Sequence, residues 1–164
     1  MRMRDIHCHI LPGLDDGSEN MDQSLRMLTE AYERGVRSII ATPHFSPQFA
    51  EHSPDRIKQL CRELENHARN RFGCRFFVLP GNEIFYSADV PQKLQEGKIL
   101  TLAETRYILL EFAPEISWRE IQRVVREMEM AGYWPVLAHV ERYQCLRKSG
   151  RLEELRQLGA YLQI

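Results

Sequence analysis

The segment DIHCHILPGLDDGS, residues 5–18, joins a short apolar run to a loop with two adjacent aspartates. A strand that only filled a core would not contain these residues, because buried His and Asp side chains are costly unless a partner satisfies them. In an extended strand, residues two apart share a face, so His7 and His9 point together and Cys8 points away. The segment therefore predicts a strand whose carboxyl end presents polar groups for binding.

The rest of the chain alternates β-rich runs with helical patterns. The expected strands are the runs 2–10, 36–45, 74–85, 106–112, 134–140 and 160–164. The expected helices are 20–35, a helix that starts at Ser53-Pro54 and continues through Leu64, a helix from the capping box SWRE (117–120) to Gly132, and 151–159. The polar stretch between the third and fourth strands is expected to be a loop. This order predicts an α/β fold with a parallel sheet covered by helices.

Composition limits the function classes. A chain of 164 residues with 43% hydrophobic content can bury one compact core, so we expect a single domain over residues 1–164. Its 22 basic and 23 acidic residues form no basic block, which argues against nucleic-acid binding. No apolar run could cross a bilayer or form a secretory signal, so we expect a cytoplasmic protein without a membrane span. The cysteines lack CxxC spacing and are interpreted as reduced thiols at Cys8, Cys61, Cys74 and Cys145.

Histidines and glutamates recur where the expected strands end. In parallel α/β folds, functional residues gather at the carboxyl ends of the strands. Five successive strand ends carry His7 with His9, His44, Glu83, Glu111 and His139. Asp16 lies in the loop after the first strand and can fold back over this rim. One such residue alone is more often a hydrogen-bonded core or rim residue, but five successive strand ends would require several coincidences. The remaining histidines, His52 and His67, lie off the rim and are interpreted as surface residues.

The mixture of side chains indicates a class of metal. Imidazoles and carboxylates without thiolates suit divalent Mn, Fe or Zn better than a structural zinc site. Seven ligands are too many for one ion, whereas two or three ions that share bridging carboxylates would use them all. Clustered metal ions of this kind serve phosphate-ester hydrolysis.

The motifs DIHCHILPGLDDG, ATPHF, GNEIFY, YILLEF and LAHVERY, in this order, resemble the PHP (polymerase and histidinol phosphatase) metal hydrolases. The closer resemblance is to the manganese-dependent bacterial tyrosine-protein phosphatases of capsule and exopolysaccharide operons, and it covers essentially the whole chain. HVERY together with GNEIFY separates this branch from histidinol phosphatases. The resemblance implies a distorted, TIM-like parallel (βα) barrel of the PHP type with fewer than eight strands. It implies metal ligation by His7, His9, Asp16, His44, Glu83, Glu111 and His139.

The resemblance also implies an activity. Two or three Mn²⁺ ions, or Fe, Zn or Mg in their place, would activate a hydroxide that attacks phosphotyrosine on a protein, such as an autophosphorylating tyrosine kinase of polysaccharide synthesis. Arg142 lies three residues after His139 and would be the catalytic cation that binds phosphate, unless it forms a surface ion pair with Glu141. Phe45 and Tyr86 are candidates to line the entrance, although aromatic residues beside strand ends are more often core.

Family members continue beyond the sequence that ends at Ile164 and supply a later Asp-x-His pair of ligands. The resemblance therefore implies that this chain is the N-terminal two thirds of the family domain, with an incomplete barrel. A sheet edge left open in this way must be paired, covered or prone to association, and a homo-oligomer is one such outcome.

Three alternatives remain open. Cys145 and Arg151 have the Cx5R spacing of cysteine-dependent tyrosine phosphatases, in which a thiolate attacks phosphorus. The same metal chemistry could act on a small phosphorylated metabolite. A non-catalytic remnant that binds metal or a kinase without turnover is the third alternative.

Overall fold

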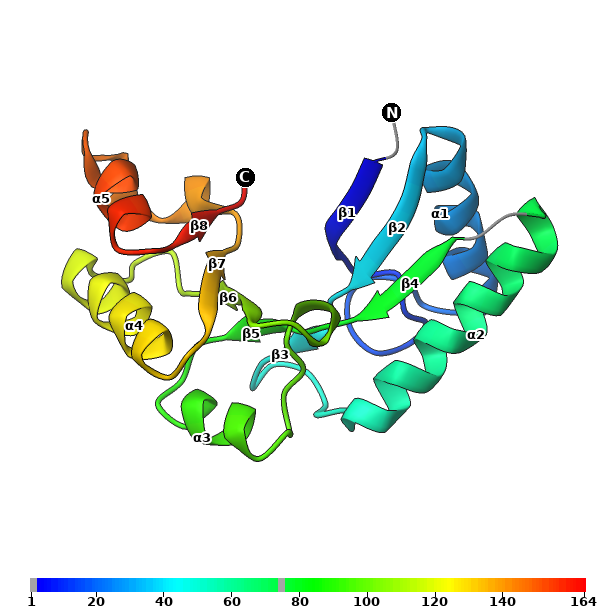
Figure 1. The fold of residues 1–164 in the computed structure, drawn as a ribbon, viewed down its shortest axis with the longest axis horizontal. Coiled ribbons are helices and arrows are strands. Elements are labelled where there is room, and N and C mark those ends of the chain that lie inside the picture. The colour runs from blue at the N-terminus through cyan, green and yellow to red at the C-terminus, as the bar shows by residue number, and fades with distance from the viewer. Residues whose placement is uncertain (1–2, 74–75) are drawn as a thin grey trace.

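The computed structural model describes residues 3–73 and 76–164 (Figure 1). Its strands are β1 (Met3–Cys8), β2 (Val36–Ala41), β3 (His44–Phe45), β4 (Phe77–Pro80), β5 (Glu83–Phe85), β6 (Tyr107–Glu111), β7 (Trp134–Leu137) and β8 (Tyr161–Leu162). Its α-helices are α1 (Met21–Glu33), α2 (Pro54–Phe72), α3 (Val90–Gln95), α4 (Trp118–Met130) and α5 (Arg151–Gln157). Three 3-10 helices are η1 (Leu102–Glu104), η2 (Val140–Arg142) and η3 (Gln144–Arg147). The expected thiol Cys74 lies outside the described residues.

The strands form two parallel sheets. The first has the order β1-β2-β4 and the second has the order β3-β5-β6-β7-β8. The predicted α/β class with parallel strands is confirmed. The resemblance implied a barrel of the PHP type that is incomplete in this chain, and no closed barrel is seen over residues 3–73 and 76–164, because β1 pairs with β2 alone and β8 with β7 alone. Figure 1 shows the helices on the outer side of the sheets, with β1 of the first sheet and β8 of the second on facing sides of the gap between them.

Two of the expected strands are each split between the sheets. The run 36–45 breaks at Thr42-Pro43, and the run 74–85 breaks at Gly81-Asn82. Proline cannot donate a ladder hydrogen bond, so the main chain leaves the first sheet here. The buried Asn82 side chain hydrogen-bonds to the main chain on both sides of it. Its Nδ2 donates to the Pro43 carbonyl at 3.0 Å and its Oδ1 accepts the Leu100 N–H at 2.9 Å. Beyond the break, His44 lies opposite Glu83 in the β3–β5 pairing.

The helix starts follow the sequence signals, and one loop prediction was wrong. Ser53 Oγ accepts the Arg56 N–H and Ser117 Oγ accepts the Glu120 N–H, so both predicted N-caps are confirmed. The expected polar loop before β6 instead contains α3 and η1. Helix α3 has six residues, begins after Asp89 with Pro91 in its first turn, makes no side-chain cap hydrogen bond and is held by burial of Val90 and Leu94.

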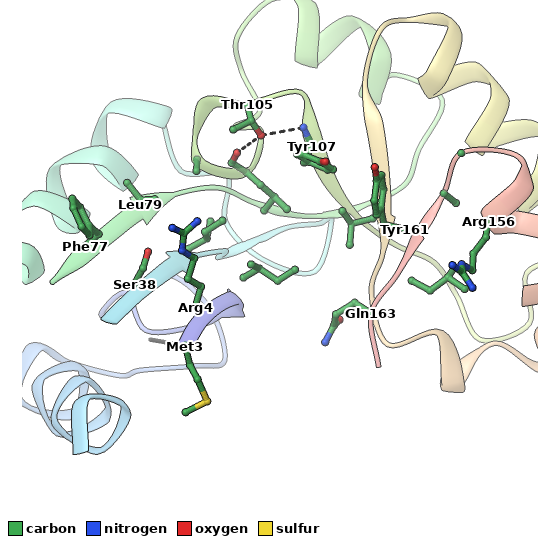
Figure 2. A pocket seen from close by; sticks show the side chains of 18 of the residues that line it. Met3, Arg4, Ser38, Phe77, Leu79, Thr105, Tyr107, Arg156, Tyr161 and Gln163 are labelled. Atoms are coloured by element: carbon green, nitrogen blue, oxygen red, sulfur yellow. Dashed lines mark hydrogen bonds between the residues drawn. The ribbon is translucent and has the colours of Figure 1, made fainter. Parts of the chain in front are cut away.

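A cavity of about 1320 Å³ lies between the two sheets (Figure 2). Arg4 on β1, Phe77 and Leu79 on β4, and Tyr161 on β8 are among the residues that line it. Gln163, which follows β8, lies at its margin and also belongs to the polar cluster described below. None of the helices in the described part of the chain is long and apolar enough to cross a membrane.

Candidate metal centre

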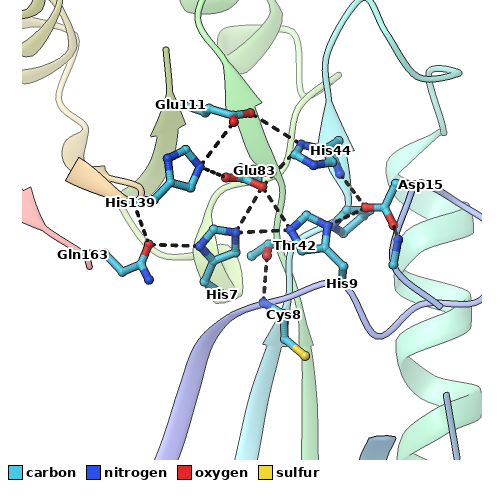
Figure 3. Close-up of polar contacts among 12 residues, drawn as sticks. His7, Cys8, His9, Asp15, Thr42, His44, Glu83, Glu111, His139 and Gln163 are labelled. Atoms are coloured by element: carbon cyan, nitrogen blue, oxygen red, sulfur yellow. Dashed lines mark hydrogen bonds and ion pairs between the residues drawn. The ribbon is translucent and has the colours of Figure 1, made fainter. Parts of the chain in front are cut away.

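The residues singled out at the strand ends meet at one place (Figure 3). The convergence predicted from the sequence brings together six side chains from five strands or the residues just after them: His7, His9, His44, Glu83, Glu111 and His139. His139 adopts a left-handed backbone conformation with φ of 34°, which a non-glycine residue rarely holds. Strain of this kind is typical of a functional site.

Glu83 is the hub of the cluster. Its Oε2 lies 3.1 Å from His7 Nε2, 3.0 Å from His9 Nε2 and 3.3 Å from His44 Nδ1. Its Oε1 lies 2.8 Å from His139 Nε2. The Glu83 side chain is only 1% exposed. Burial opposes its ionisation, but the hydrogen bonds with His139, His7 and His9 outweigh burial and hold the pKa of Glu83 far below its usual value.

Glu111 supplies a second carboxylate on the other side of this hub. Its Oε1 lies 3.2 Å from His139 Nε2 and its Oε2 lies 3.6 Å from His44 Nδ1. Asp16 is at the rim, with a side chain 66% exposed and Oδ1 3.5 Å from His44 Nε2. Arg142, on η2, is 60% exposed and its Nη1 lies 4.0 Å from Glu111 Oε1. The structure thus places six expected ligands inside the cluster and the other two expected site residues at its edge.

Sequence reasoning missed Asp15, the neighbour of Asp16. Its side chain is 1% exposed; Oδ2 lies 2.7 Å from His9 Nδ1 and accepts the His44 N–H at 3.0 Å. Asp15 Oδ1 accepts the Gly17 N–H at 3.0 Å. A Cβ on Gly17 would lie 2.2 Å from the His9 carbonyl oxygen, so only glycine lets the loop approach this closely. The Asp-Asp-Gly sequence was the available signal, but it does not say which aspartate turns inward.

Sequence reasoning also missed Gln163 and Phe49. Gln163 Oε1 lies 3.0 Å from His7 Nδ1 and accepts the His139 N–H at 3.1 Å. The Phe49 ring stacks on the His44 ring with centroids 4.8 Å apart. Neither residue carries a charge or a metal-ligand group, so a search for ligand types passes over both.

The other aromatic and histidine assignments are resolved by contacts. Phe45 is buried in the core, and Tyr86 donates its hydroxyl proton to Glu127 Oε2 at 2.9 Å. His52 is not a simple surface residue, because its Nε2 lies 2.9 Å from the Leu14 carbonyl oxygen. His67 is exposed on α2.

Two imidazoles of the cluster are strongly basic. Burial disfavours a charged His9, but hydrogen bonds with Asp15 and Glu83 prevail and raise its pKa to about 10. Burial likewise opposes charge on His139, and contacts with Glu111 and Glu83 raise its pKa to about 9. The centre is therefore a place where positive charge is strongly favoured.

The donor set fits divalent cations. Three overlapping groups have ligand atoms within 4.8 Å of one another: His7-His9-Glu83, His9-Asp16-His44 and His44-Glu83-Glu111. His44 Nδ1 is buried without a hydrogen-bond partner although it faces two carboxylates, and a bound cation would use its lone pair. Nitrogen and carboxylate oxygen donors without thiolate suit Mn, Fe or Zn ions.

The contacts of Cys145 and Arg151, the two ends of the Cx5R segment, differ from those of a phosphate-binding loop. An Arg151 Nη1 proton is donated to the Cys145 carbonyl oxygen, and the guanidinium lies over the Trp118 ring at 5.1 Å. Burial raises the pKa of the Cys145 thiol. A protonated thiol beside an arginine that is already bonded to the main chain is a poor nucleophile for phosphorus.

Comparisons with known proteins give a family match and similar sequences. Residues 3–164 match the family model described as capsular polysaccharide synthesis, CpsB/CapC. The chain is 36% identical to the tyrosine-protein phosphatase CpsB of Streptococcus agalactiae serotype V, over 99% of this chain and 67% of that protein. It is 36% identical to the tyrosine-protein phosphatase YwqE of Bacillus subtilis, over 99% of this chain and 64% of that protein.

A solved structure is also similar, with a TM-score of 0.88 and 36% identity. It belongs to a crystallographic study of YwqE from Bacillus subtilis and CpsB from Streptococcus pneumoniae, described as unique metal-dependent tyrosine phosphatases. The match covers 99% of this chain and 66% of that one. This chain thus spans about two thirds of the length of the relatives that it matches.

Replacing the hub carboxylate should remove metal binding. Glu83→Gln keeps the shape of the side chain but removes the charge shared by four imidazoles, so Mn²⁺ affinity should fall by roughly a hundredfold or more. Isothermal titration calorimetry measures this affinity, with Glu153→Gln on the exposed face of α5 as the matched control. A Glu83→Gln chain that binds Mn²⁺ as tightly as the wild type would show that the cluster is not a metal centre.

The raised histidine pKa values predict how stability depends on pH when metal is chelated. An imidazole whose pKa rises from about 6.5 on folding stabilises the fold fully below pH 6.5, and this contribution is lost as pH rises through the folded-state pKa. For His139 and His9 that loss begins near pH 6.5 and is complete by about pH 9 and pH 10, respectively. Thermal unfolding in chelator should show a falling midpoint across this window, and saturating Mn²⁺ should flatten the fall. An equal fall with and without Mn²⁺ would contradict this account.

Proposed function

This chain belongs to the CpsB/CapC family of capsular polysaccharide synthesis, and from that premise we propose that it is a metal-dependent phosphatase that hydrolyses phosphotyrosine on proteins. The family resemblance inferred from the sequence motifs is confirmed. The observation that carries the proposal is the buried Glu83 carboxylate, which contacts four imidazoles that lie in or just after three strands, β1, β3 and β7. The relatives named as tyrosine phosphatases favour phosphotyrosine over a small phosphorylated metabolite.

The proposed metal ligands are the residues of the cluster and its rim: His7, His9, Asp16, His44, Glu83, Glu111 and His139. We propose two or three ions, with manganese as the physiological metal, since the donor set is compatible with it. When bound, such ions act as Lewis acids on phosphoryl oxygens and lower the pKa of attacking water towards neutrality. Glu83 and Glu111 would balance the charge of the ions, and Asp15 holds His9 in position through the contact with its Nδ1.

Arg142 is the proposed phosphate-binding cation. Its guanidinium is exposed at the rim, and its 4.0 Å contact with Glu111 is too long to occupy its five donors. A phosphate bound in front of the cluster would accept a forked pair of hydrogen bonds from it. Tyrosine leaves as a phenolate with a pKa of about 10, so the reaction places little demand on a general acid.

The proposed setting follows from the family. The protein substrate would be a bacterial tyrosine kinase of polysaccharide synthesis, and association into a homo-oligomer would cover the open sheet edges. Residues 1–164 would form the N-terminal two thirds of a PHP-type metal-hydrolase domain, in keeping with the 67% share of CpsB that they match. Cys8, Cys61 and Cys145 are free thiols, which suits the reducing cytoplasm.

The activity can be tested with a phosphotyrosine peptide, p-nitrophenyl phosphate and histidinol phosphate in the presence of Mn²⁺. We expect the two aryl phosphates to be hydrolysed, the chelator EDTA to stop turnover and Mn²⁺ to restore it, with Cys145→Ser unaffected. Preference for histidinol phosphate would favour the metabolite alternative. Mn²⁺ binding without turnover would favour a non-catalytic remnant, and loss of activity in Cys145→Ser would revive the thiolate mechanism.

The role of Arg142 predicts a selective kinetic defect. Arg142→Ala should lower kcat/KM for the phosphotyrosine peptide by roughly a hundredfold, because the equatorial oxygens lose a cation, while Mn²⁺ affinity stays near the wild-type value. Arg147→Ala, which removes an exposed arginine on η3, is the matched control. Equal kcat/KM values for the two variants would remove Arg142 from the site.

A further inference from the structure

Gln163 contacts both sides of the open edge between the two sheets. It follows β8, and its main chain extends the pairing with the end of β7: Gln163 N–H donates to the Leu137 carbonyl at 2.9 Å, and Val140 N–H donates to the Gln163 carbonyl at 3.0 Å. Its side chain reaches His7, which belongs to β1 in the other sheet (Figure 3). A single residue therefore links β7, β8 and the first metal-ligand motif.

The contacts of Gln163 fix which way its amide points. The His139 N–H must donate, and the atom it meets at 3.1 Å is therefore the amide oxygen Oε1. The amide nitrogen Nε2 donates to the Ile164 carbonyl oxygen at 2.8 Å. Both ends of the amide are satisfied in this orientation, and flipping it would set a donor against the His139 N–H.

The amide orientation in turn fixes the tautomer of His7. Gln163 Oε1 can only accept a hydrogen bond, and His7 Nδ1 lies 3.0 Å from it. His7 Nδ1 must therefore carry a proton and donate it to Oε1. Without metal, His7 Nε2 donates its proton to the Glu83 carboxylate; when a cation displaces that proton, Nδ1 keeps its own and Nε2 offers a bare lone pair. This lone pair faces Glu83 Oε2 at 3.1 Å and His9 Nε2 at 3.2 Å, which is the first group of candidate metal ligands.

Gln163 Oε1 also accepts the backbone N–H of His139. His139 has φ of 34°, and its N–H at Oε1 is one of the contacts that stabilise this uncommon conformation. In that conformation its Nε2 reaches Glu83 Oε1 at 2.8 Å. One oxygen atom thus acts on ligands at the carboxyl ends of β1 and β7.

We propose that Gln163 is a positioning residue of the metal centre, which holds His7 in the tautomer that offers Nε2 to a cation and fixes the backbone of His139. This inference rests on the metal-binding part of the proposed function and does not depend on turnover. Partners that orient metal-bound histidines typically change metal affinity by about 10- to 100-fold when removed.

The test compares two substitutions that differ in one property. Gln163→Met has a similar length and no acceptor, whereas Gln163→Glu keeps an oxygen for both N–H groups. Titration with Mn²⁺ alone should show affinity about 10- to 100-fold weaker in Gln163→Met and at least as tight as that of the wild type in Gln163→Glu. Gln157→Met, an exposed glutamine on α5, is the control and should match the wild type.

A spectroscopic measurement separates positioning from a general loss of structure. In chains saturated with Zn²⁺, the His7 Nδ1 proton should give a slowly exchanging downfield NMR signal in the wild type and Gln163→Glu. In Gln163→Met this proton has lost its acceptor, so its signal should broaden through exchange with water while the unfolding midpoint at saturating Zn²⁺ stays close to that of Gln157→Met.

Each outcome decides the proposal. The proposal is overturned if Gln163→Met binds Mn²⁺ with wild-type affinity, or if Gln163→Glu binds it as weakly as Gln163→Met does. It is also overturned if Gln163→Met unfolds before it can be loaded, or if the wild-type chain binds no Mn²⁺. The wild type and the variants could show the expected affinities for Mn²⁺ while none of them hydrolyses a phosphotyrosine peptide. That result would support the positioning role and reject the phosphatase function.

Discussion

A buried carboxylate must be compensated by positive charge, and this constraint on Glu83 organises the whole centre. Its partners come from β1, β3 and the ends of β1 and β7, so the charge balance of one side chain ties the two sheets together. Protons on His9 and His139 can supply the compensation, and so can divalent cations. The contact that stabilises the fold is therefore the same contact that a metal ion would take over.

The backbone arrangement that permits this is a shared break in two neighbouring strands. Pro43 and Gly81 lie where the first sheet ends, and Asn82 joins the two breaks through hydrogen bonds with Pro43 and Leu100. Without the break, residues 44 and 83 would continue the first sheet. With it, His44 and Glu83 lie side by side at the start of the second sheet, directly beside His9. The polar residues that look like the ends of long strands in the sequence are thus at the junction between sheets.

The sequence signals predicted what depends on local chemistry. Ser53 and Ser117 marked helix starts because capping is local, and ligand types at successive strand ends predicted the convergence because parallel strands share one rim. The division of the strands between two sheets depends on tertiary pairing, which periodicity does not encode. The inward turn of Asp15 instead of Asp16 depends on the close approach of Gly17 to His9, which the pattern does not show. Helix α3, with six residues, is too short to show a clear helical period and depends on burial of Val90 and Leu94.

The residues missed by sequence reasoning give the centre an asymmetry. His7 and His9 face each other through Nε2 atoms 3.2 Å apart, yet their other nitrogens meet different partners. His9 Nδ1 bonds to the ionised Asp15, which makes its ring strongly basic, whereas His7 Nδ1 bonds to the neutral amide of Gln163. A carboxylate partner increases the electron density that an imidazole offers a cation more than an amide does. Two histidines that the sequence presents as equivalent should therefore be unequal ligands, with His9 binding the cation more strongly than His7.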